Sequence, residues 1–82
     1  NSSGEINSKV SDTHQATEHV RNTYQSQDVS MDELDGLTVN GDTWWFNLRP
    51  SNTEPLLRLN VEASTQAQME SVRDAVLSLI RG

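Results

Sequence analysis

The chain has no cysteine among its 82 residues, and aromatic and basic side chains are few. Without cysteine, neither a disulfide framework nor a thiolate metal site can form. No apolar run reaches the ~18 residues of a membrane-spanning helix, so no membrane partner is expected. The first residues contain no basic segment followed by an apolar one, as a signal peptide would. We therefore expect a cytoplasmic protein.

Basic residues are outnumbered, because six Lys and Arg stand against twelve Asp and Glu, a formal net charge of -6. Nucleic-acid binding draws mainly on lysine and arginine that meet phosphates, so this balance argues against a nucleic-acid partner. One small phosphate is not excluded, because distant charges are screened over about 8 Å in the cell. The charge close to a site then matters more than the total.

The length predicts one domain with a single core, residues 1–82. The apolar fraction of 33% and the mean hydropathy of -0.67 are low for a globular domain. Most of the polar excess lies in residues 1–36, and the stronger apolar pattern lies in residues 37–82. The sequence opens on Asn1 rather than Met, so we expect a piece of a longer protein.

Alternating apolar residues predict several strands. The first is short and covers residues 5–10, with Ile6, Ser8 and Val10 on one face. A hairpin is predicted at Asn40-Gly41, the strongest short signal for a turn between strands. The returning strand carries its inward side chains at Trp44, Phe46 and Leu48, which leaves Trp45 partly exposed. The next strand has its inward side chains at Leu57, Leu59, Val61 and Ala63.

Two helices are predicted from apolar stripes at helical spacing. The first follows a cap at Ser11, Asp12 or Thr13 and runs to about residue 27, with a stripe of Ala16, Val20 and Tyr24. The second starts after Thr65, which forms a capping box with Gln68. Its stripe consists of Met69, Val72, Ala75, Val76, Leu79 and Ile80. The element order β-α-β(4)-α predicts an α+β domain of two layers, with an antiparallel sheet and both helices on one face.

Two groups of residues contain side chains that can bind metals, but the pattern of each argues against a metal site. Residues 28–35 are acidic, but they lack the alternating oxygen ligands of a calcium loop and are predicted to form a solvated connection or an edge strand. His14 and His19 are five residues apart, so they do not share one helix face. We expect exposed histidines and no metal bound by this domain.

The segment from Arg49 to Pro55 is rich in hydrogen-bond donors and is framed by two prolines. An arginine can grip two phosphate oxygens with its planar fork, while Ser51 and Thr53 donate hydroxyl protons and Asn52 donates amide protons. The backbone N–H groups of residues 51–54 can also line an anion-binding concavity. A rigid tip between two strands is predicted here, with a phosphate monoester as the ligand.

Composition alone leaves a second interpretation open for this segment. Loops rich in Ser, Asn, Thr and Pro are common, and an ordinary tight loop with a surface arginine fits the same residues. Arg58 alternates onto the outer face of its strand. It is predicted to be a residue of the sheet surface or a partner of Glu62 rather than a phosphate ligand.

The motif Arg-Pro-Ser-Asn-Thr-Glu-Pro, followed by residues 56–63, resembles the C-terminal domain of the α-D-phosphohexomutases. In that family the loop has the form Arg-x-Ser-(Asn/Gly)-Thr-x-Pro. Residues 3–7, residues 34–37 and the strand at residues 44–48 agree with it, so the resemblance covers nearly the whole chain. Asn52, in place of glycine, is more similar to the phosphomannomutase/phosphoglucomutase branch than to the phosphoglucosamine mutases.

The resemblance implies a fold like that of the TATA-box-binding protein, without implying that DNA is bound. It implies that Arg49, Ser51, Asn52 and Thr53 hold the non-reacting phosphate of a mannose or glucose 1- or 6-phosphate. The implied reaction is a reversible 1-to-6 phosphoryl shift, in which other domains of the same chain supply a serine nucleophile and Mg²⁺. This sequence contains neither the family's active-site serine motif nor its aspartate-rich magnesium loop, so the chain alone is expected to be inactive. A free-standing anion-binding or interaction module with no catalytic parent stays open as the alternative.

Overall fold

The computed structural model describes residues 1–81, and Gly82, the last residue of the predicted domain, lies outside them. The predicted order of strands and helices is confirmed. The elements are β1 (Ile6–Lys9), α1 (Thr13–Gln25), β2 (Ser30–Asp32), β3 (Leu37–Asn40), β4 (Trp44–Pro50), β5 (Leu56–Ala63) and α2 (Gln66–Arg81). The acidic segment therefore contains a short strand, one of the two structures predicted for it.

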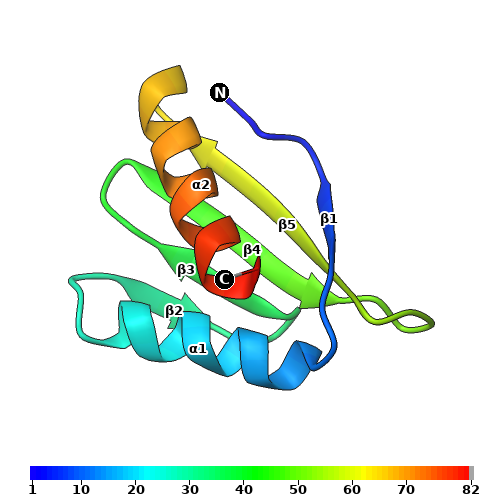
Figure 1. Cartoon of the computed structure of the whole chain (residues 1–82). Coiled ribbons are helices and arrows are strands. Elements are labelled where there is room, and N and C mark those ends of the chain that lie inside the picture. The colour runs from blue at the N-terminus through cyan, green and yellow to red at the C-terminus, as the bar shows by residue number, and fades with distance from the viewer. Residues whose placement is uncertain (82) are drawn as a thin grey trace.

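The five strands form one sheet in the order β1-β5-β4-β3-β2, and every neighbouring pair is antiparallel. Both helices cover the same face of this sheet, and the other face is open (Figure 1). The predicted α+β class and the placing of both helices on one face are thus confirmed. The three-residue strand β2 forms one edge of the sheet and β1 forms the other.

The core lies between the helices and the inward face of the central strands. Period-two alternation puts Leu57, Leu59 and Val61 of β5 in the core, while Arg58 and Asn60 face the open side. The fully buried large side chains are Phe46, Leu37, Leu48, Leu57, Leu59, Val20, Val39, Val61 and Val76. The strand faces predicted from the sequence are therefore confirmed.

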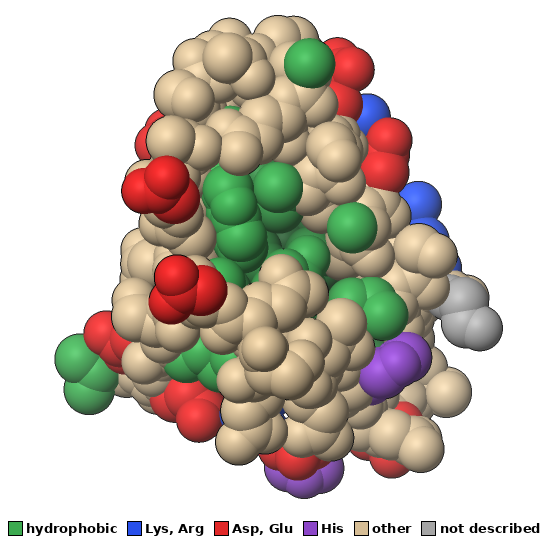
Figure 2. Space-filling model, turned by 90° about the vertical axis from the view of Figure 1, so that its left-hand side faces the viewer, with side chains coloured by type: hydrophobic (Ala, Val, Ile, Leu, Met, Phe, Trp, Pro, Cys, Tyr) green, Lys and Arg blue, Asp and Glu red, His purple; other side chains and the backbone are tan. Residues whose placement is uncertain are grey.

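An aromatic cluster joins the first helix to the sheet. The ring of Tyr24 on α1 lies 5.2 Å from the ring of Phe46 in an edge-to-face arrangement, and 5.9 Å from the ring of Trp44. Trp44 and Phe46 stack with their ring centroids 6.1 Å apart. The side of the molecule that lies at the left in Figure 1 is hollowed, and hydrophobic side chains are visible in the hollow (Figure 2).

The helix caps agree with the sequence in part. The Asp12 carboxylate accepts a hydrogen bond from the backbone N–H of Gln15 at 3.0 Å, which selects Asp12 among the predicted caps of α1. The Thr65 hydroxyl accepts the N–H of Gln68 at 3.2 Å, as a capping box requires. The reciprocal bond was predicted wrongly, because the Gln68 side chain instead accepts the hydroxyl of Thr43 at 2.8 Å.

Two further details differ from the prediction. Ala75 is exposed, because α2 turns Met69, Val76 and Ile80 toward the sheet and Ala75 lies farther round the helix. The predicted hairpin is present, but Asn40 ends β3 and pairs with Trp45, so residues 41–43 form its loop. Within residues 1–81, neither helix is long and apolar enough to cross a bilayer.

Leu59→Ala and Asn60→Ala are adjacent substitutions on opposite faces of β5. Truncation of the fully buried Leu59 leaves a cavity, and we expect the free energy of unfolding to fall by about 2–5 kcal/mol. The change at Asn60 should stay within about 0.5 kcal/mol, as for most surface substitutions. Urea unfolding measures both values. Equal losses would contradict the assignment of the two faces.

Burial raises the pKa of the Tyr24 phenol above its ordinary value of 10.0, because the charged phenolate would have to lie inside the core. A raised pKa in the folded state means that the stabilising effect is fully present below about pH 10 and is lost as the pH rises further. We expect the free energy of unfolding to fall above that pH. Tyr24→Phe is the control, and it should remove this part of the alkaline decline. An unchanged decline in the variant would assign the effect to other groups.

Candidate functional site

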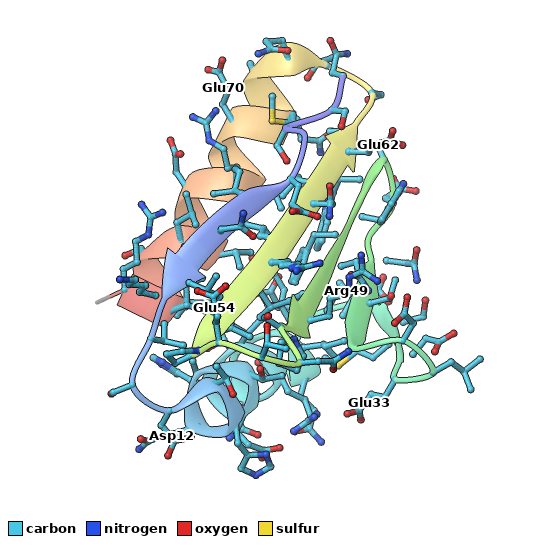
Figure 3. All side chains as sticks on the ribbon, turned by 90° about the vertical axis from the view of Figure 1, so that its right-hand side faces the viewer. Asp12, Glu33, Arg49, Glu54, Glu62 and Glu70 are labelled. Carbon is cyan, nitrogen blue, oxygen red and sulfur yellow. The ribbon has the colours of Figure 1, made fainter. Side chains whose placement is uncertain are left out.

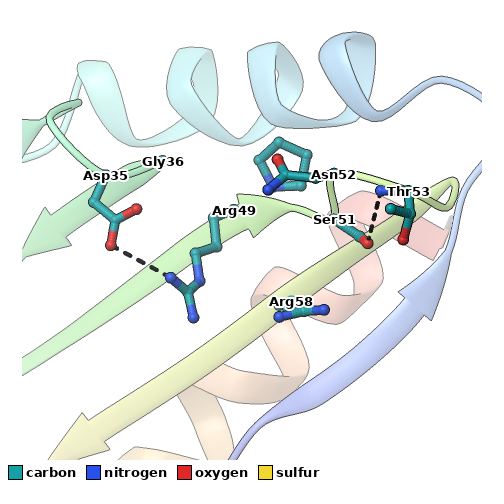
Figure 4. Close-up of a pocket in the computed structure, with 8 residues that line it drawn as sticks. Asp35, Gly36, Arg49, Ser51, Asn52, Thr53 and Arg58 are labelled. Carbon is teal, nitrogen blue, oxygen red and sulfur yellow. Dashed lines mark hydrogen bonds and ion pairs between the residues drawn. The ribbon is translucent and has the colours of Figure 1, made fainter.

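A cavity of about 470 Å³ opens at the end of the sheet where β4 meets β5. The antiparallel order brings the β2–β3 and β4–β5 connections to this same end. The cavity is lined by Asp35, Gly36, Arg49, Pro50, Ser51, Asn52, Thr53 and Arg58. All four site residues predicted from the sequence therefore lie around one cavity (Figure 4).

Arg49 lies on strand β4, and its prediction as part of the loop was wrong. The strand continues through Pro50, because Arg49 pairs with Arg58 and Pro50 pairs with Leu57 across the ladder to β5. The connection proper is residues 51–55. Arg49 thus projects from a paired strand on the open face of the sheet (Figure 3), so its backbone is held more firmly than a loop residue would be.

The β4–β5 connection is closed by its own hydrogen bonds. The backbone N–H of Ser51 donates to the carbonyl of Leu56 at 2.9 Å, so this N–H is not directed at a ligand as predicted. The N–H of Thr53 lies 3.4 Å from the Ser51 hydroxyl oxygen. The carbonyl of Pro55 accepts the N–H of Val10 at 3.0 Å, which ties the connection to the segment after β1. The side chains of Asn52 and Thr53 remain exposed beside the cavity.

The Arg49 guanidinium contacts one carboxylate. Its Nη1 lies 3.4 Å from Oδ2 of Asp35, whose side chain is 78% exposed. An ion pair this long and this exposed contributes about 0–1 kcal/mol, so an anionic ligand can compete with it for the guanidinium. The Nε atom of Arg49 is buried and has no hydrogen-bond partner in the part of the chain that the structure describes.

Arg58, which the sequence did not predict as a phosphate ligand, also lines the cavity. It lies on the open face of β5 as predicted, but directly opposite Arg49, and it lines the same cavity. The predicted alternative of a pair with Glu62 is wrong, since none of the ion pairs among residues 1–81 joins the two. The register of the β4–β5 hairpin could have predicted that Arg58 lies at the cavity. A five-residue connection between Pro50 and Leu56 places Arg49 opposite Arg58.

Two arginines directly opposite each other on a sheet repel, and such like-charge pairs are destabilising. Asp35 neutralises part of this charge from the side of Arg49 that faces away from Arg58 (Figure 4). The hydroxyl and amide groups of residues 51–53 lie on the side of the cavity away from Asp35. This donor set suits an anion placed between the two arginines.

The same residues do not suit a cation. The cavity contains one carboxylate and two guanidinium groups. Among residues 1–81, no cluster of three or more His, Cys, Asp or Glu side chains could hold a metal ion. His14 and His19 are both exposed on α1, as the sequence predicted.

A sequence profile described as the phosphoglucomutase/phosphomannomutase C-terminal domain matches residues 5–79, almost the whole chain. The chain belongs to this family. The match includes all the residues that line the cavity.

Similar proteins carry corresponding names. A phosphomannomutase of Methanocaldococcus jannaschii is 44% identical over 78 residues, which are 95% of this chain and 17% of the relative. A protein of Xanthomonas campestris pv. campestris named phosphohexose mutases is 47% identical over 81 residues, 98% of this chain and 18% of the relative. A phosphomannomutase of Escherichia coli K12 is 39% identical over 75 residues, 92% of this chain and 16% of the relative. The chain thus spans less than a fifth of the length of these relatives.

Proposed function

We propose that this domain holds the non-reacting phosphate of a hexose phosphate in a cytoplasmic phosphomannomutase/phosphoglucomutase. The observation that carries this proposal is the opposed pair Arg49 and Arg58, which share a cavity with Ser51, Asn52 and Thr53. The family membership supports it, because the relatives are phosphomannomutases and phosphohexose mutases.

A phosphate monoester fits the site for electrostatic and geometric reasons. Its charge offsets the repulsion between Arg49 and Arg58, and each guanidinium can donate to two of its oxygens. The hydroxyls of Ser51 and Thr53 and the Asn52 amide offer further donors at the cavity rim. Because β4 and β5 hold the backbones of both arginines on a paired sheet, little backbone entropy is lost when the ligand binds.

In the proposed enzyme, the domain positions the substrate rather than reacting with it. A phosphoryl group moves reversibly between O1 and O6 of the hexose through a bisphosphorylated intermediate, and this chemistry depends on positioning and charge stabilisation. The serine that carries the phosphoryl group and the Mg²⁺ belong, in this proposal, to parts of the longer protein outside these 82 residues. The choice between mannose and glucose is likewise proposed to lie in those parts.

Titration of the 82-residue chain with glucose 1-phosphate should shift the backbone amide signals of residues 51–54 in NMR spectra. Arg49→Ala should abolish or strongly weaken the shifts, because it removes a fork of charged donors. Arg73→Ala is the matched control, since Arg73 lies on α2 and pairs with Asp74. Glucose without phosphate should leave these signals in place. The proposal fails if the sugar phosphate also leaves them unmoved at saturating concentration.

Arg49→Ala in the full-length enzyme should lower kcat/KM by about tenfold to a hundredfold, because a charge-assisted hydrogen bond contributes about 1.5–3 kcal/mol. Steady-state kinetics with mannose and glucose phosphates measure the loss. Wild-type kinetics in this variant would contradict the assigned role.

The 82-residue chain alone should show no mutase turnover in the same assay, because its sequence contains neither the serine nor the metal-binding motif of the family. Turnover by this chain would require a nucleophile within it, and the proposed division of labour would then be wrong.

A further inference from the structure

The segment that bounds the cavity opposite the β4–β5 connection contains a glycine packed against Arg49. Gly36 has a φ of +70°, a conformation that side chains rarely adopt. A Cβ atom built on Gly36 would lie 2.5 Å from Cβ of Arg49 and 2.6 Å from the carbonyl oxygen of Leu48. Any side chain at this position would therefore push the β2–β3 connection and Arg49 apart.

Polar contacts hold the same segment in place. The Asn47 side chain, two residues before Arg49 on the same face of β4, donates to the carbonyl oxygen of Asp35 at 2.7 Å and to the Thr38 hydroxyl at 3.0 Å. The Asp35 carboxylate in turn faces the Arg49 guanidinium. Asn47 of β4 thus binds residues on both sides of Gly36 in the sequence, Asp35 before it and Thr38 after it.

The Arg49 side chain has few other restraints. Its buried Nε has no hydrogen-bond partner in the described part of the chain, so its one polar contact there is the long pair with Asp35. With so few polar contacts, packing against the first carbons of the side chain can affect the direction of the guanidinium. Gly36 packs against this side chain from the β2–β3 connection, because a Cβ built on it would lie 2.5 Å from Cβ and 2.9 Å from Cα of Arg49.

We propose that Gly36, with Asp35 beside it, is a positioning residue that aims the Arg49 guanidinium at the bound phosphate; this rests on the proposed function. The absence of a side chain lets the β2–β3 connection lie against the first carbons of Arg49. The Asp35 carboxylate holds the side of the guanidinium that faces away from Arg58 (Figure 4). The other Nη group of Arg49 makes no hydrogen bond within residues 1–81 and is left for the phosphate.

Gly36→Ala tests this inference against Gly4→Ala, a matched control. Both glycines have a φ near +70°, but a Cβ on Gly4 meets nothing within 4 Å. Both variants place a side chain at a similar positive φ, so the contacts with Arg49 and with the Leu48 carbonyl oxygen distinguish them. NMR titration of the 82-residue chain with inorganic phosphate should show a Kd raised by about tenfold in Gly36→Ala, the effect of losing one charge-assisted hydrogen bond. In Gly4→Ala, Kd should stay within about twofold of the unmodified chain, since distant sites act independently.

A double variant shows whether the effect passes through Arg49. In the Arg49→Ala variant, residue 49 keeps its Cα and Cβ but loses the guanidinium. The steric clash introduced by Gly36→Ala therefore remains in the double variant. Gly36→Ala should then raise Kd no further. A full additional tenfold rise in that background would show a general disturbance of the loop and would overturn the inference.

Asn47→Ala covers the case in which Gly36→Ala does not fold. It removes the bond to the Asp35 carbonyl without introducing a clash, and it should weaken phosphate binding and shift the Arg49 Nε–Hε signal. Unchanged affinity in both Gly36→Ala and Asn47→Ala, with normal binding by the unmodified chain, would overturn the positioning role alone. No phosphate binding by the unmodified chain would instead overturn the proposed function.

Discussion

The pairing of β4 with β5 determines both the core and the candidate site. Seven residue pairs join the two strands in one register, from Trp44 opposite Ala63 to Pro50 opposite Leu57. Because side chains alternate between faces, this register puts Leu48 and Leu59 in the core and brings two arginines together on the open face. A slip of one residue would expose the core side chains and separate the arginines. Burial of the apolar face thus fixes the geometry of the polar face.

Much of the fold follows from local patterns. Alternation and helical stripes predict the element order, the inward faces of β4 and β5, and a helix cap among Ser11, Asp12 and Thr13, because each depends on residues close together in the chain. The errors have non-local causes. Gln68 bonds to Thr43 of the β3–β4 loop rather than to its own helix cap, and Ala75 is exposed because of how α2 settles on the sheet.

In the candidate site, too, local patterns predict some residues, while others depend on contacts between distant parts of the chain. The motif predicts Arg49, Ser51, Asn52 and Thr53, which lie within five positions, and the structure brings all four to one cavity. Arg58 was discounted because its environment depends on strand register, and the contribution of Gly36 depends on a contact with a distant strand. Sequence patterns identify the donors, but the atoms that orient them come from elsewhere in the chain.

The arrangement of the strands also affects how this domain meets other molecules. Its longest strands, β4 and β5, are internal, and the edges are formed by β1 and β2, with four and three residues. Such short edges expose few unpaired backbone groups for strand addition by another chain. The acidic side chain of Asp32 at the end of β2 further disfavours that kind of aggregation. Recognition at the open sheet face, where the candidate site lies, depends instead on side chains.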